Sequence, residues 1–389
     1  MGVNLGDKET YRLSTNLSQG AVHVKSVFPR HQGPSILDTP LDSPPKRDSG
    51  NSEIPEIKVH KFLDAYFKPT NRFNAVYSRN QCLIAGRHEP GPWDFGVMTG
   101  NGAGKVLWQS RHFIETAKAR RREFIPKGIY VGSRAPYNYY HWIVNALPSL
   151  FIAHAIAKVN DDYPAIIPRA VLENENLLAS VRAISGEREI YIWDNDVELH
   201  VREAVVVNPP PVYDTPLSLL ESKRTPLACH TPLMRLFREA ILDGVDRQRS
   251  QQDLPERIFV ARPEGGTRSS NQKELIEIAE GYGFSIFRPE EHCFADQVAT
   301  FHSAEYIAGP GGAAFTNLLF CSGGAKALLW KPRHISAENP FANLASIANS
   351  TLYALQTQAA NGSDKHLSSP WFLEPTRLAS ALKQLVGHS

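Results

Sequence analysis

The chain has few long hydrophobic runs and almost no excess of charge of either sign. Its most apolar stretch, residues 146–157, is interrupted by Pro148, Ser149 and His154, and it is shorter than the ~20 residues that cross a bilayer. A formal net charge of +2 is too balanced for a protein that binds nucleic acid through its phosphates. We therefore expect a soluble protein that has no nucleic-acid partner.

Cysteine is scarce, and a targeting signal is missing. The four cysteines form no C-x-x-C pair, so the sequence indicates neither a zinc site nor a disulfide framework. The N-terminal residues lack the basic and apolar regions of a secretory signal, and Gly6 stands where a myristoylation signal needs Ser or Thr. These absences predict a cytoplasmic protein. The cysteines are Cys82, Cys229, Cys293 and Cys321.

One dense basic run contrasts with this balanced charge, and it consists of Lys118, Arg120, Arg121 and Arg122. A run of this kind usually forms a solvated surface. The alternative is peripheral contact with anionic lipid at the inner face of the membrane, or with a lipid-linked acceptor. The sequence leaves both interpretations open.

Length and proline content predict three segments. Residues 1–55 contain six prolines among Ser, Asp and Gly and no apolar period that could bury a face, so we expect a Pro-rich flexible N-terminal extension. Residues 56–250 are expected to form an N-terminal domain, in which strand patterns precede a helix with a wide apolar face that begins near Asn138. Residues 251–389 are expected to form a C-terminal domain.

The region 257–330 has the most regular pattern. Short apolar segments alternate with amphipathic helical segments at the spacing of βαβ units, which predicts an α/β fold with a parallel, doubly wound sheet. Ligands of such sheets bind at the loops that leave the carboxyl ends of the strands. We therefore expect the binding residues of this domain in those loops.

One of these loops is rich in glycine. It joins a strand to a helix, so its backbone N–H groups and the positive end of the helix dipole can receive a phosphate or diphosphate. Arg262 and Arg268 follow the first strand of the same sheet and can add charge-assisted hydrogen bonds. The alternative is a tight turn whose glycines only permit positive φ. The residues of this turn are Gly309, Gly311, Gly312 and Ala313.

Several motifs follow one another in a fixed order along the chain. They comprise Tyr139, Tyr140, His141, Trp142, Asn145, Leu147 and Pro148, then Arg262, Arg268, Asn271 and Glu274, then Gly283, Phe284, Pro289, Glu290, Phe294 and Gln297, and last Gly309, Pro310, Gly312, Ala313, Thr316 and Asn317. Together they resemble glycosyltransferase family 61, and in particular its bacterial capsular polysaccharide biosynthesis members. The likeness covers about residues 130–330, and residues 371–375 resemble the C-terminal return of the family. Several motifs in order are far more specific than any one of them.

The resemblance implies a GT-B architecture, in which two Rossmann-like domains face a cleft. It also implies inverting transfer of a sugar from a nucleotide-sugar donor without a metal or another cofactor. Residues 56–250 would then be the acceptor-side domain and residues 251–389 the donor-binding domain, with a glycan or lipid-linked glycan as acceptor. Besides the turn and its two arginines, the cleft candidates are Tyr140, Asn145, Asn271, Glu290, Thr316 and Asn317.

An inverting transferase needs a base for the acceptor hydroxyl and a group that stabilises the leaving diphosphate. We expect Arg262, Arg268 and the glycine turn to bind the diphosphate. His141 is the expected base, because the ordinary pKa of an imidazole lies near neutrality. The alternative for His141 is a core histidine hydrogen-bonded at the head of its helix. Glu290 can hold a ribose or can complement the dipole of the helix that follows it.

Two further motifs are interpreted as turns. Asp194 and Asp196 have the spacing of a metal-binding D-x-D, but they lie between two strand patterns, which favours a turn rich in Asx residues. Residues 100–105 imitate a P-loop, but Thr99 and Val106 stand where that motif needs Gly and then Ser or Thr. A hairpin is therefore expected there, and a P-loop NTPase is disfavoured.

The sequence thus predicts a cytoplasmic, inverting, metal-independent glycosyltransferase that adds a sugar to a surface or capsular polysaccharide. Gly311 stands where many members of the family have His, which raises an alternative: a non-catalytic member that binds a sugar nucleotide or a glycan. Turnover of a nucleotide-sugar donor distinguishes these two functions.

Overall fold

The computed structural model divides the 389-residue chain into two compact units. Unit 1 comprises residues 1–32 and 53–225, and unit 2 comprises residues 33–52 and 226–389. Both units combine strands with helices, so the predicted α/β class is confirmed. The structure describes residues 8–14, 17–34, 39–41, 51–54, 56–68, 75–78, 81–84, 106–109, 113–132, 136–194, 196–208, 212–213, 228–246, 254–263, 271–332, 340–359 and 371–387.

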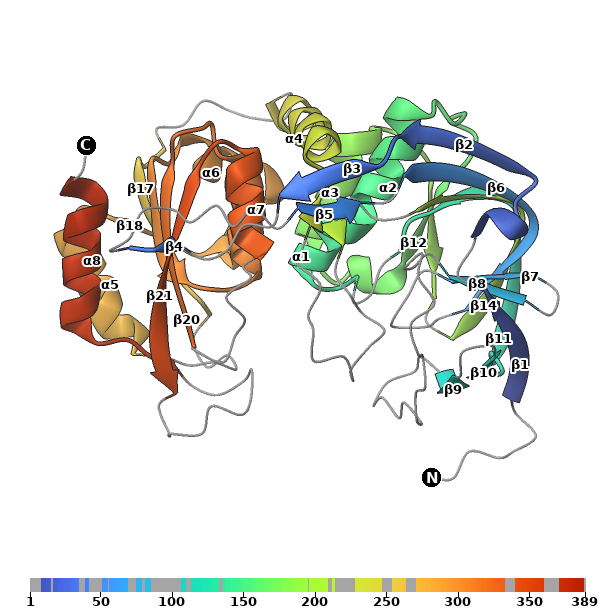
Figure 1. Ribbon diagram of the computed structural model, residues 1–389, viewed down its shortest axis with the longest axis horizontal. Coiled ribbons are helices and arrows are strands. Elements are labelled where there is room, and N and C mark those ends of the chain that lie inside the picture. The colour runs from blue at the N-terminus through green and yellow to red at the C-terminus, as the bar shows by residue number, and fades with distance from the viewer. Residues whose placement is uncertain are drawn as a thin grey trace. The chain divides into compact units, whose positions relative to one another are not determined.

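Unit 1 is built on a mixed sheet (Figure 1). Among the described residues its strand order is β13-β12-β11-β14-β6-β7-β8-β1-β10-β9, and β2 pairs with β6. The first four strands of this order pair in parallel, whereas β14, β6 and β7 pair antiparallel. The strands are β1 (Lys8–Ser14), β2 (His23–Phe28), β6 (Ile57–Phe67), β7 (Ala75–Ser78), β8 (Gln81–Ile84), β9 (Val106–Gln109), β10 (Phe113–Ala117), β11 (Arg121–Tyr130), β12 (Ala165–Pro168), β13 (Ile190–Trp193) and β14 (Val197–Asn208).

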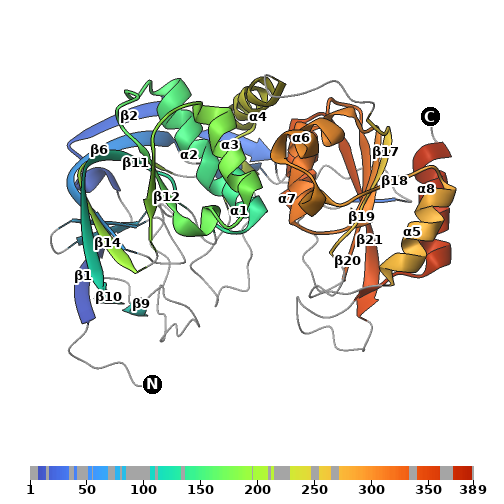
Figure 2. The ribbon, with the colours of Figure 1, turned by 180° about the vertical axis from the view of Figure 1, so that it is seen from behind.

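Two helical crossovers connect the parallel strands of unit 1. The first runs from residue 139 to residue 156 and joins β11 to β12, which confirms the helix predicted from Asn138 onward. The second, α3 (Glu175–Ser185), joins β12 to β13, and Figures 1 and 2 show both crossovers on one side of the sheet. The first crossover consists of α1 (Tyr139–His141), the π-helical turn η2 (Trp142–Ala146), α2 (Leu147–Phe151) and a second π-helical turn, η3 (Ile152–Ile156). Unit 1 also contains two short 3₁₀ turns outside this crossover, η1 (Leu17–Gln19) and η4 (Arg169–Val171).

Unit 2 contains the predicted doubly wound sheet. Its described strands have the order β18-β17-β19-β20-β21-β22, with β4 beside β21, and β18 through β21 all pair in parallel. The strands are β4 (Thr39–Pro40), β17 (Arg257–Val260), β18 (Ser285–Phe287), β19 (Tyr306–Pro310), β20 (Lys326–Pro332), β21 (Thr351–Ala359) and β22 (Trp371–Phe372). The helices are α4 (Thr231–Asp246), α5 (Gln272–Gly281), α6 (Phe294–Ser303), α7 (Pro340–Ile347), α8 (Pro375–Gly387) and the 3₁₀ helices η5 (Pro289–Glu291) and η6 (Ala313–Phe320).

Helices cover both faces of this parallel sheet (Figures 1 and 2). One apolar cluster joins the sheet to α6, η6 and α7 through Phe301, Leu318 and Ala345. The other joins it to α5 and α8 through Leu275 and Leu382. Strands that are buried on both faces have continuous apolar runs rather than alternating ones, and this is why the region 257–330 has so regular a pattern.

The first 55 residues differ from the expected flexible extension. Among the residues described there, β1 pairs with β8 and β10, β2 pairs with β6, and β4 pairs with β21. Backbone hydrogen bonds hold these strands in the sheets. The side chains of β2 are exposed or half-buried, so its sequence does not show the apolar alternation that would have predicted a strand. The prolines at positions 44, 45 and 55 lie outside the described residues.

The division between the units also differs from the expected boundary at residue 250. The longer segment of unit 2 begins at Pro226, because α4 packs against α6 and α7 and so belongs with the second sheet. The strands β3 (His31–Pro34), β5 (Asn51–Ile54), β15 (Val212–Tyr213) and β16 (Ala228–Cys229) lie where the chain passes from one unit to the other. The hairpin turn expected at residues 100–105 lies outside the described residues, which resume at β9.

A buried histidine makes the stability of unit 1 depend on pH. His60 in β6 is 1% exposed, and its Nε2 lies 3.1 Å from Oγ of Ser18. Burial lowers the pKa of His60 to about 4, from an ordinary value of 6.5. The folded protein therefore binds this proton less readily than the unfolded chain does, so acid favours unfolding.

The first prediction concerns this residue. The contribution of neutral His60 to the free energy of unfolding is fully present above pH 6.5 and is lost as the pH falls toward 4. We expect His60→Gln, whose amide does not titrate, to show a smaller loss of stability between pH 7 and pH 4 in urea denaturation. His23→Gln, at an exposed site on β2, is the control. Equal pH dependence in the wild type and His60→Gln would contradict the prediction.

Candidate functional site

The helical crossover at residues 139–156 carries the candidate residues of unit 1. Asn138 caps it, because its side-chain oxygen accepts hydrogen bonds from the backbone N–H groups of Tyr140 at 3.0 Å and His141 at 3.3 Å. Asn is a favourable N-cap residue, since its side chain satisfies N–H groups that have no partner in the first helical turn. The cap thus fixes where the helix begins and where His141 lies.

His141 and Asn145 contact each other one turn apart. Nδ1 of the imidazole lies 3.0 Å from Oδ1 of Asn145. An amide oxygen can only accept, so Nδ1 carries the proton of this hydrogen bond, and Nε2 of the neutral ring carries a lone pair. Asn145 belongs to the π-helical turn Trp142–Ala146, and such turns are frequent at functional sites. The pair has the chemistry of an oriented proton acceptor.

The residues around this pair are packed into unit 1. Tyr140 is 9% exposed, and its ring lies edge-on to the imidazole with the centroids 5.4 Å apart. Trp142 is fully buried and donates from Nε1 to Oγ of Ser180 on α3 at 2.9 Å. His141 is half-exposed in this first turn, as is Tyr139.

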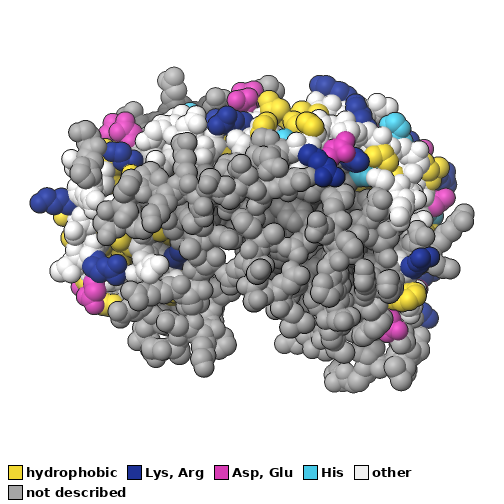
Figure 3. Space-filling view, viewed as in Figure 1, with side chains coloured by type: hydrophobic (Ala, Val, Ile, Leu, Met, Phe, Trp, Pro, Cys, Tyr) yellow, Lys and Arg dark blue, Asp and Glu magenta, His cyan; other side chains and the backbone are white. Residues whose placement is uncertain are grey.

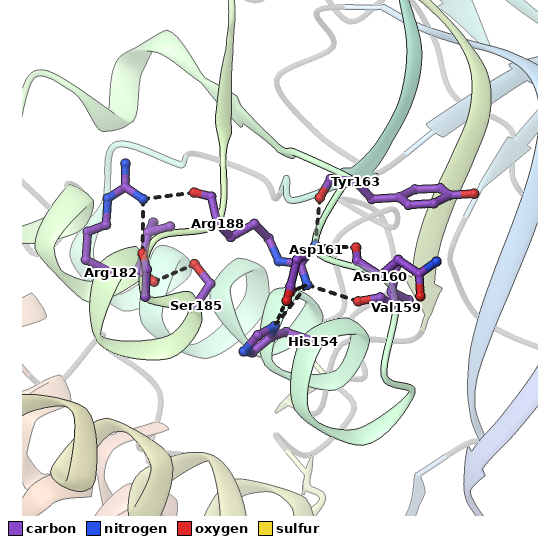
Figure 4. A network of polar contacts seen from close by, with 10 residues as sticks. His154, Val159, Asn160, Asp161, Tyr163, Arg182, Ser185 and Arg188 are labelled. Carbon is purple, nitrogen blue, oxygen red and sulfur yellow. Dashed lines mark hydrogen bonds and ion pairs between the residues drawn. The ribbon is translucent and has the colours of Figure 1, made fainter.

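Arg188 holds the other end of the same crossover (Figure 4). Its side chain has no exposed surface, and it contacts Nδ1 of His154 at 2.9 Å and the carboxylate of Asp161 at 2.7 Å. Its guanidinium also donates to the backbone carbonyls of Val159 at 3.0 Å, Asn160 at 2.8 Å and Tyr163 at 2.7 Å. A guanidinium has five N–H donors in one plane, so this single side chain satisfies the carbonyls that follow the helix.

The charge of Arg188 also acts on His154. Burial foremost, and then the nearby guanidinium, lower the pKa of His154, and Asp161 only partly opposes them. The neutral imidazole can accept a hydrogen bond from Arg188, whereas the protonated one would repel it. Acid therefore weakens this end of the crossover in the same direction as it acts on His60.

The candidate residues of unit 2 gather where the strand order of its sheet reverses. In chain order the strands β17 to β21 are arranged 2-1-3-4-5, so the connections that leave β17 and β19 run to opposite sides of the sheet. Ligands of doubly wound sheets bind at such a switch point, outside the carboxyl ends of the strands. Arg262 follows β17, and the glycine turn ends β19 and leads into η6. The structure therefore brings these two predicted features together.

Arg262 contacts the glycine turn directly. Its Nη2 donates to the backbone carbonyl of Gly311 at 2.5 Å. A Cβ atom at position 312 would lie 2.6 Å from this same Nη2, and one at position 309 would lie 2.5 Å from the backbone oxygen of Val260. Only glycine allows the backbone of β17 and the side chain of Arg262 to approach the turn this closely.

The backbone N–H groups of the glycine turn differ in their hydrogen bonding. The N–H of Gly311 donates to the carbonyl of Trp330 at 2.9 Å, which holds this residue in the sheet. The N–H groups of Gly312, Ala313 and Ala314 precede the first bonded N–H of η6, at Phe315, and so have no partner within the helix by its geometry. An anion at this turn would meet these three N–H groups and the guanidinium of Arg262.

Other candidates of unit 2 support this edge of the sheet. The side chain of Asn317 is fully buried and donates to Oε1 of Gln297 at 3.2 Å, while Gln297 donates to the carbonyls of Pro289 and His292. Thr316 is also fully buried, and its Oγ1 has no hydrogen-bond partner among the described residues. Glu290 is exposed at the carboxyl end of β18. Arg268 lies outside the described residues.

The D-x-D sequence is engaged by arginines. Oδ2 of Asp194 lies 2.9 Å from Nη2 of Arg121, the same Nη2 lies 3.3 Å from Oδ1 of Asp196, and Arg169 donates to Asp194. The hydrogen bonds from Arg169 and Arg121 lower the pKa of the Asp194 carboxyl. Across the described ranges, no group of three or more His, Cys, Asp or Glu side chains is arranged to hold a metal ion. Asn195 lies outside the described residues.

The dense basic run is also partly paired. Arg121 contacts the two aspartates, and Arg122 contacts Glu9 at 3.4 Å and Glu198 at 3.0 Å. On the face shown in Figure 3, the coloured Lys and Arg side chains are interspersed with Asp and Glu rather than gathered in one surface. Within the described part of the chain, none of the helices is long and apolar enough to cross a membrane.

A parallel sheet with an arginine and a glycine turn at its switch point is typical of α/β proteins that bind phosphate-bearing ligands. Comparison with known protein families gives a narrower class. Residues 139–328, which are 190 of the 389 residues and span parts of both units, match the family model described as Glycosyltransferase 61. Over these residues the chain belongs to glycosyltransferase family 61. None of the curated proteins compared with the chain matches it.

The second prediction concerns Arg188. We expect Arg188→Met to lower the free energy of unfolding by about 2–4 kcal/mol, because three backbone carbonyls and His154 would lose charge-assisted hydrogen bonds from a buried guanidinium. Arg182→Met is a matched control on α3, since Arg182 also donates to two carbonyls but is half-buried, and we expect it to cost no more than about 1 kcal/mol. Urea denaturation measures both. Equal losses in the two variants would show that Arg188 has no special role in holding the crossover.

Proposed function

We propose that this protein is an inverting, metal-independent glycosyltransferase that moves a sugar from a nucleotide-sugar donor to a surface or capsular polysaccharide. Membership of family 61 supports glycosyl transfer in general. The observation that carries the donor assignment is the contact of Arg262 with the turn at Gly311 and Gly312, at the switch point of a doubly wound sheet. Unit 2 is then the donor-binding part and unit 1 the acceptor part, as in the GT-B architecture.

The diphosphate of the donor would bind at the carboxyl ends of β17 and β19. Charge develops on its leaving oxygen as the bond to the anomeric carbon breaks, so fixed N–H donors and a cation stabilise the transition state more than the bound substrate. Arg262 and the N–H groups of residues 312–314 supply these donors, and Arg268 is proposed to add a second guanidinium. Glu290, exposed one strand away, is proposed to accept hydrogen bonds from ribose hydroxyls.

His141 is proposed as the base that activates the acceptor. Its Nε2 would take the proton of the acceptor hydroxyl while the oxygen forms a bond with the anomeric carbon. The bond from that carbon to the diphosphate breaks at the opposite face, and the nucleoside diphosphate leaves, which inverts the configuration. The hydrogen bond from Nδ1 to Asn145 supports this role because it holds the tautomer whose Nε2 can accept a proton.

Metal independence is proposed from the chemistry of the candidate groups. The carboxylates of Asp194 and Asp196 are engaged by Arg121 and Arg169, which favours a structural role for this D-x-D. A guanidinium beside N–H groups provides the positive potential that a metal ion provides in D-x-D transferases. We propose that the reaction takes place in the cytoplasm, as the supply of nucleotide-sugar donors requires.

The third prediction tests the donor site. We expect one of UDP, GDP, CDP, ADP and dTDP to raise the melting temperature of the protein in the presence of EDTA. Arg262→Gln should raise the dissociation constant of that nucleotide about 10- to 100-fold, because charge-assisted hydrogen bonds contribute about 1.5–3 kcal/mol. Arg257→Gln is the matched control. Arg257 lies at the amino end of the same strand, donates to one carbonyl at 2.8 Å and lies over Tyr306 at 5.4 Å.

Three outcomes of this experiment would change the proposal. Binding that requires Mg²⁺ or Mn²⁺ would contradict metal independence. Equal binding by the wild type and Arg262→Gln would contradict the assignment of Arg262. Nucleotide-sugar binding without turnover, against any glycan acceptor offered, would favour a non-catalytic member of the family.

The fourth prediction concerns the base. His141→Ala should lower kcat by about 10²- to 10⁴-fold with little change in donor affinity, and Asn145→Ala should lower kcat less, because it removes only the orienting hydrogen bond. His154→Gln, at the other end of the same crossover, should retain the rate per folded molecule. If His141→Ala instead keeps its rate per folded molecule and loses stability, His141 is a packing residue and another group is the base.

A further inference from the structure

The side chain of Arg262 rests on a residue that lies beyond the family match. Its Cζ lies 5.1 Å from the ring centroid of Trp371, whereas the match ends at residue 328. Trp371 is 2% exposed, so its ring is a fixed surface. The attraction between a cation and an aromatic face is strongest for Trp and grows when the contact is shielded from water.

The backbone of Arg262 is fixed independently of this contact. Its N–H donates to Oε1 of Gln272 at 2.8 Å, and its carbonyl accepts from Nε2 of the same side chain at 2.9 Å. Gln272 is the first residue of α5. This pair of hydrogen bonds ties the end of β17 to the start of the helix, so the side chain of Arg262 starts from a fixed point.

The neighbouring residue, Asn271, fixes the segment that carries Trp371. Its Nδ2 donates to the carbonyl of Leu373 at 2.9 Å, and its Oδ1 accepts from the N–H of Leu373 at 3.2 Å. The strand β22, which contains Trp371, also pairs antiparallel with β21. Two adjacent amide side chains at the start of α5 therefore hold both parts of this contact: Gln272 binds the backbone of Arg262, and Asn271 binds the segment that carries Trp371.

We propose that Trp371 is a positioning residue of the donor site: it fixes the plane of the Arg262 guanidinium before the diphosphate binds. This inference rests on the proposed donor site. Arginine has many rotamers, and a ligand that must order them loses affinity. An arginine already held against an indole ring and the carbonyl of Gly311 presents its planar guanidinium in one orientation, which suits the two-point recognition of phosphate oxygens.

The fifth prediction tests this role with two substitutions of Trp371. Trp371→Leu removes the aromatic face, and we expect it to raise the dissociation constant of the nucleoside diphosphate that the wild type binds about 3- to 30-fold in calorimetric titration. Trp371→Phe keeps an aromatic face and should restore most of this loss. If Trp371 only stabilised the fold, the loss of nucleotide affinity in each variant would parallel its loss in free energy of unfolding. Urea denaturation measures that free energy separately.

Tyr306→Leu is the matched control. It removes the ring under Arg257, at the amino end of the same strand, and should leave nucleotide affinity unchanged. Asn271→Ala keeps the test decisive if Trp371→Leu does not fold, because it removes the two hydrogen bonds to the backbone of Leu373 without deleting an apolar side chain, and it should also weaken binding.

The outcomes distinguish this inference from the proposed function. A wild type that binds no nucleoside diphosphate overturns the donor site and this inference with it. A wild type that binds one, with Trp371→Leu or Asn271→Ala binding it equally well, overturns the role of Trp371 alone. Weaker binding in those variants, restored by Phe, supports it.

Discussion

The candidate donor site depends on the contacts that the guanidinium of Arg262 makes. This guanidinium is held between the ring of Trp371 and the carbonyl of Gly311, and the absence of a Cβ at position 312 makes room for it. Arg262, Gly311 and Trp371 come from three different parts of unit 2: the end of β17, the end of β19 and the C-terminal strand β22. The parallel sheet is what brings the three together.

Unit 1 uses a comparable arrangement around a helix. Asn138 satisfies the N–H groups at the start of the 139–156 crossover, and Arg188 satisfies the carbonyls that follow its end. Each cap replaces hydrogen bonds that the helix itself cannot make. Between them the crossover holds His141 and Asn145 in fixed register. Both units therefore position their candidate polar groups by satisfying backbone atoms at the ends of regular elements.

Several features could be predicted from the sequence because their causes are local. The βαβ alternation of residues 257–330 reflects burial on both faces of the strands, and the glycine turn reflects close approach of neighbouring backbone. The N-terminal strands could not be predicted, since β1, β2 and β4 are held by pairing with strands distant in sequence rather than by an apolar face of their own. Arg188 and Gln272 carried no signal either, because an isolated polar residue becomes structural only when distant carbonyls meet it.

By itself the sequence determined the class of fold, the family, and the short list of residues that includes His141, Arg262 and the glycine turn. These depend on periodicity and on motif order, which are properties of the chain alone. Only the tertiary structure decided what each residue touches: that Asn145 contacts His141, that Arg121 and Arg169 engage the D-x-D, and that Trp371 lies beneath Arg262. Arg262 and Trp371 are 109 positions apart (371 − 262), and a contact across that distance is set by strand pairing and packing, which leave no pattern between the two residues.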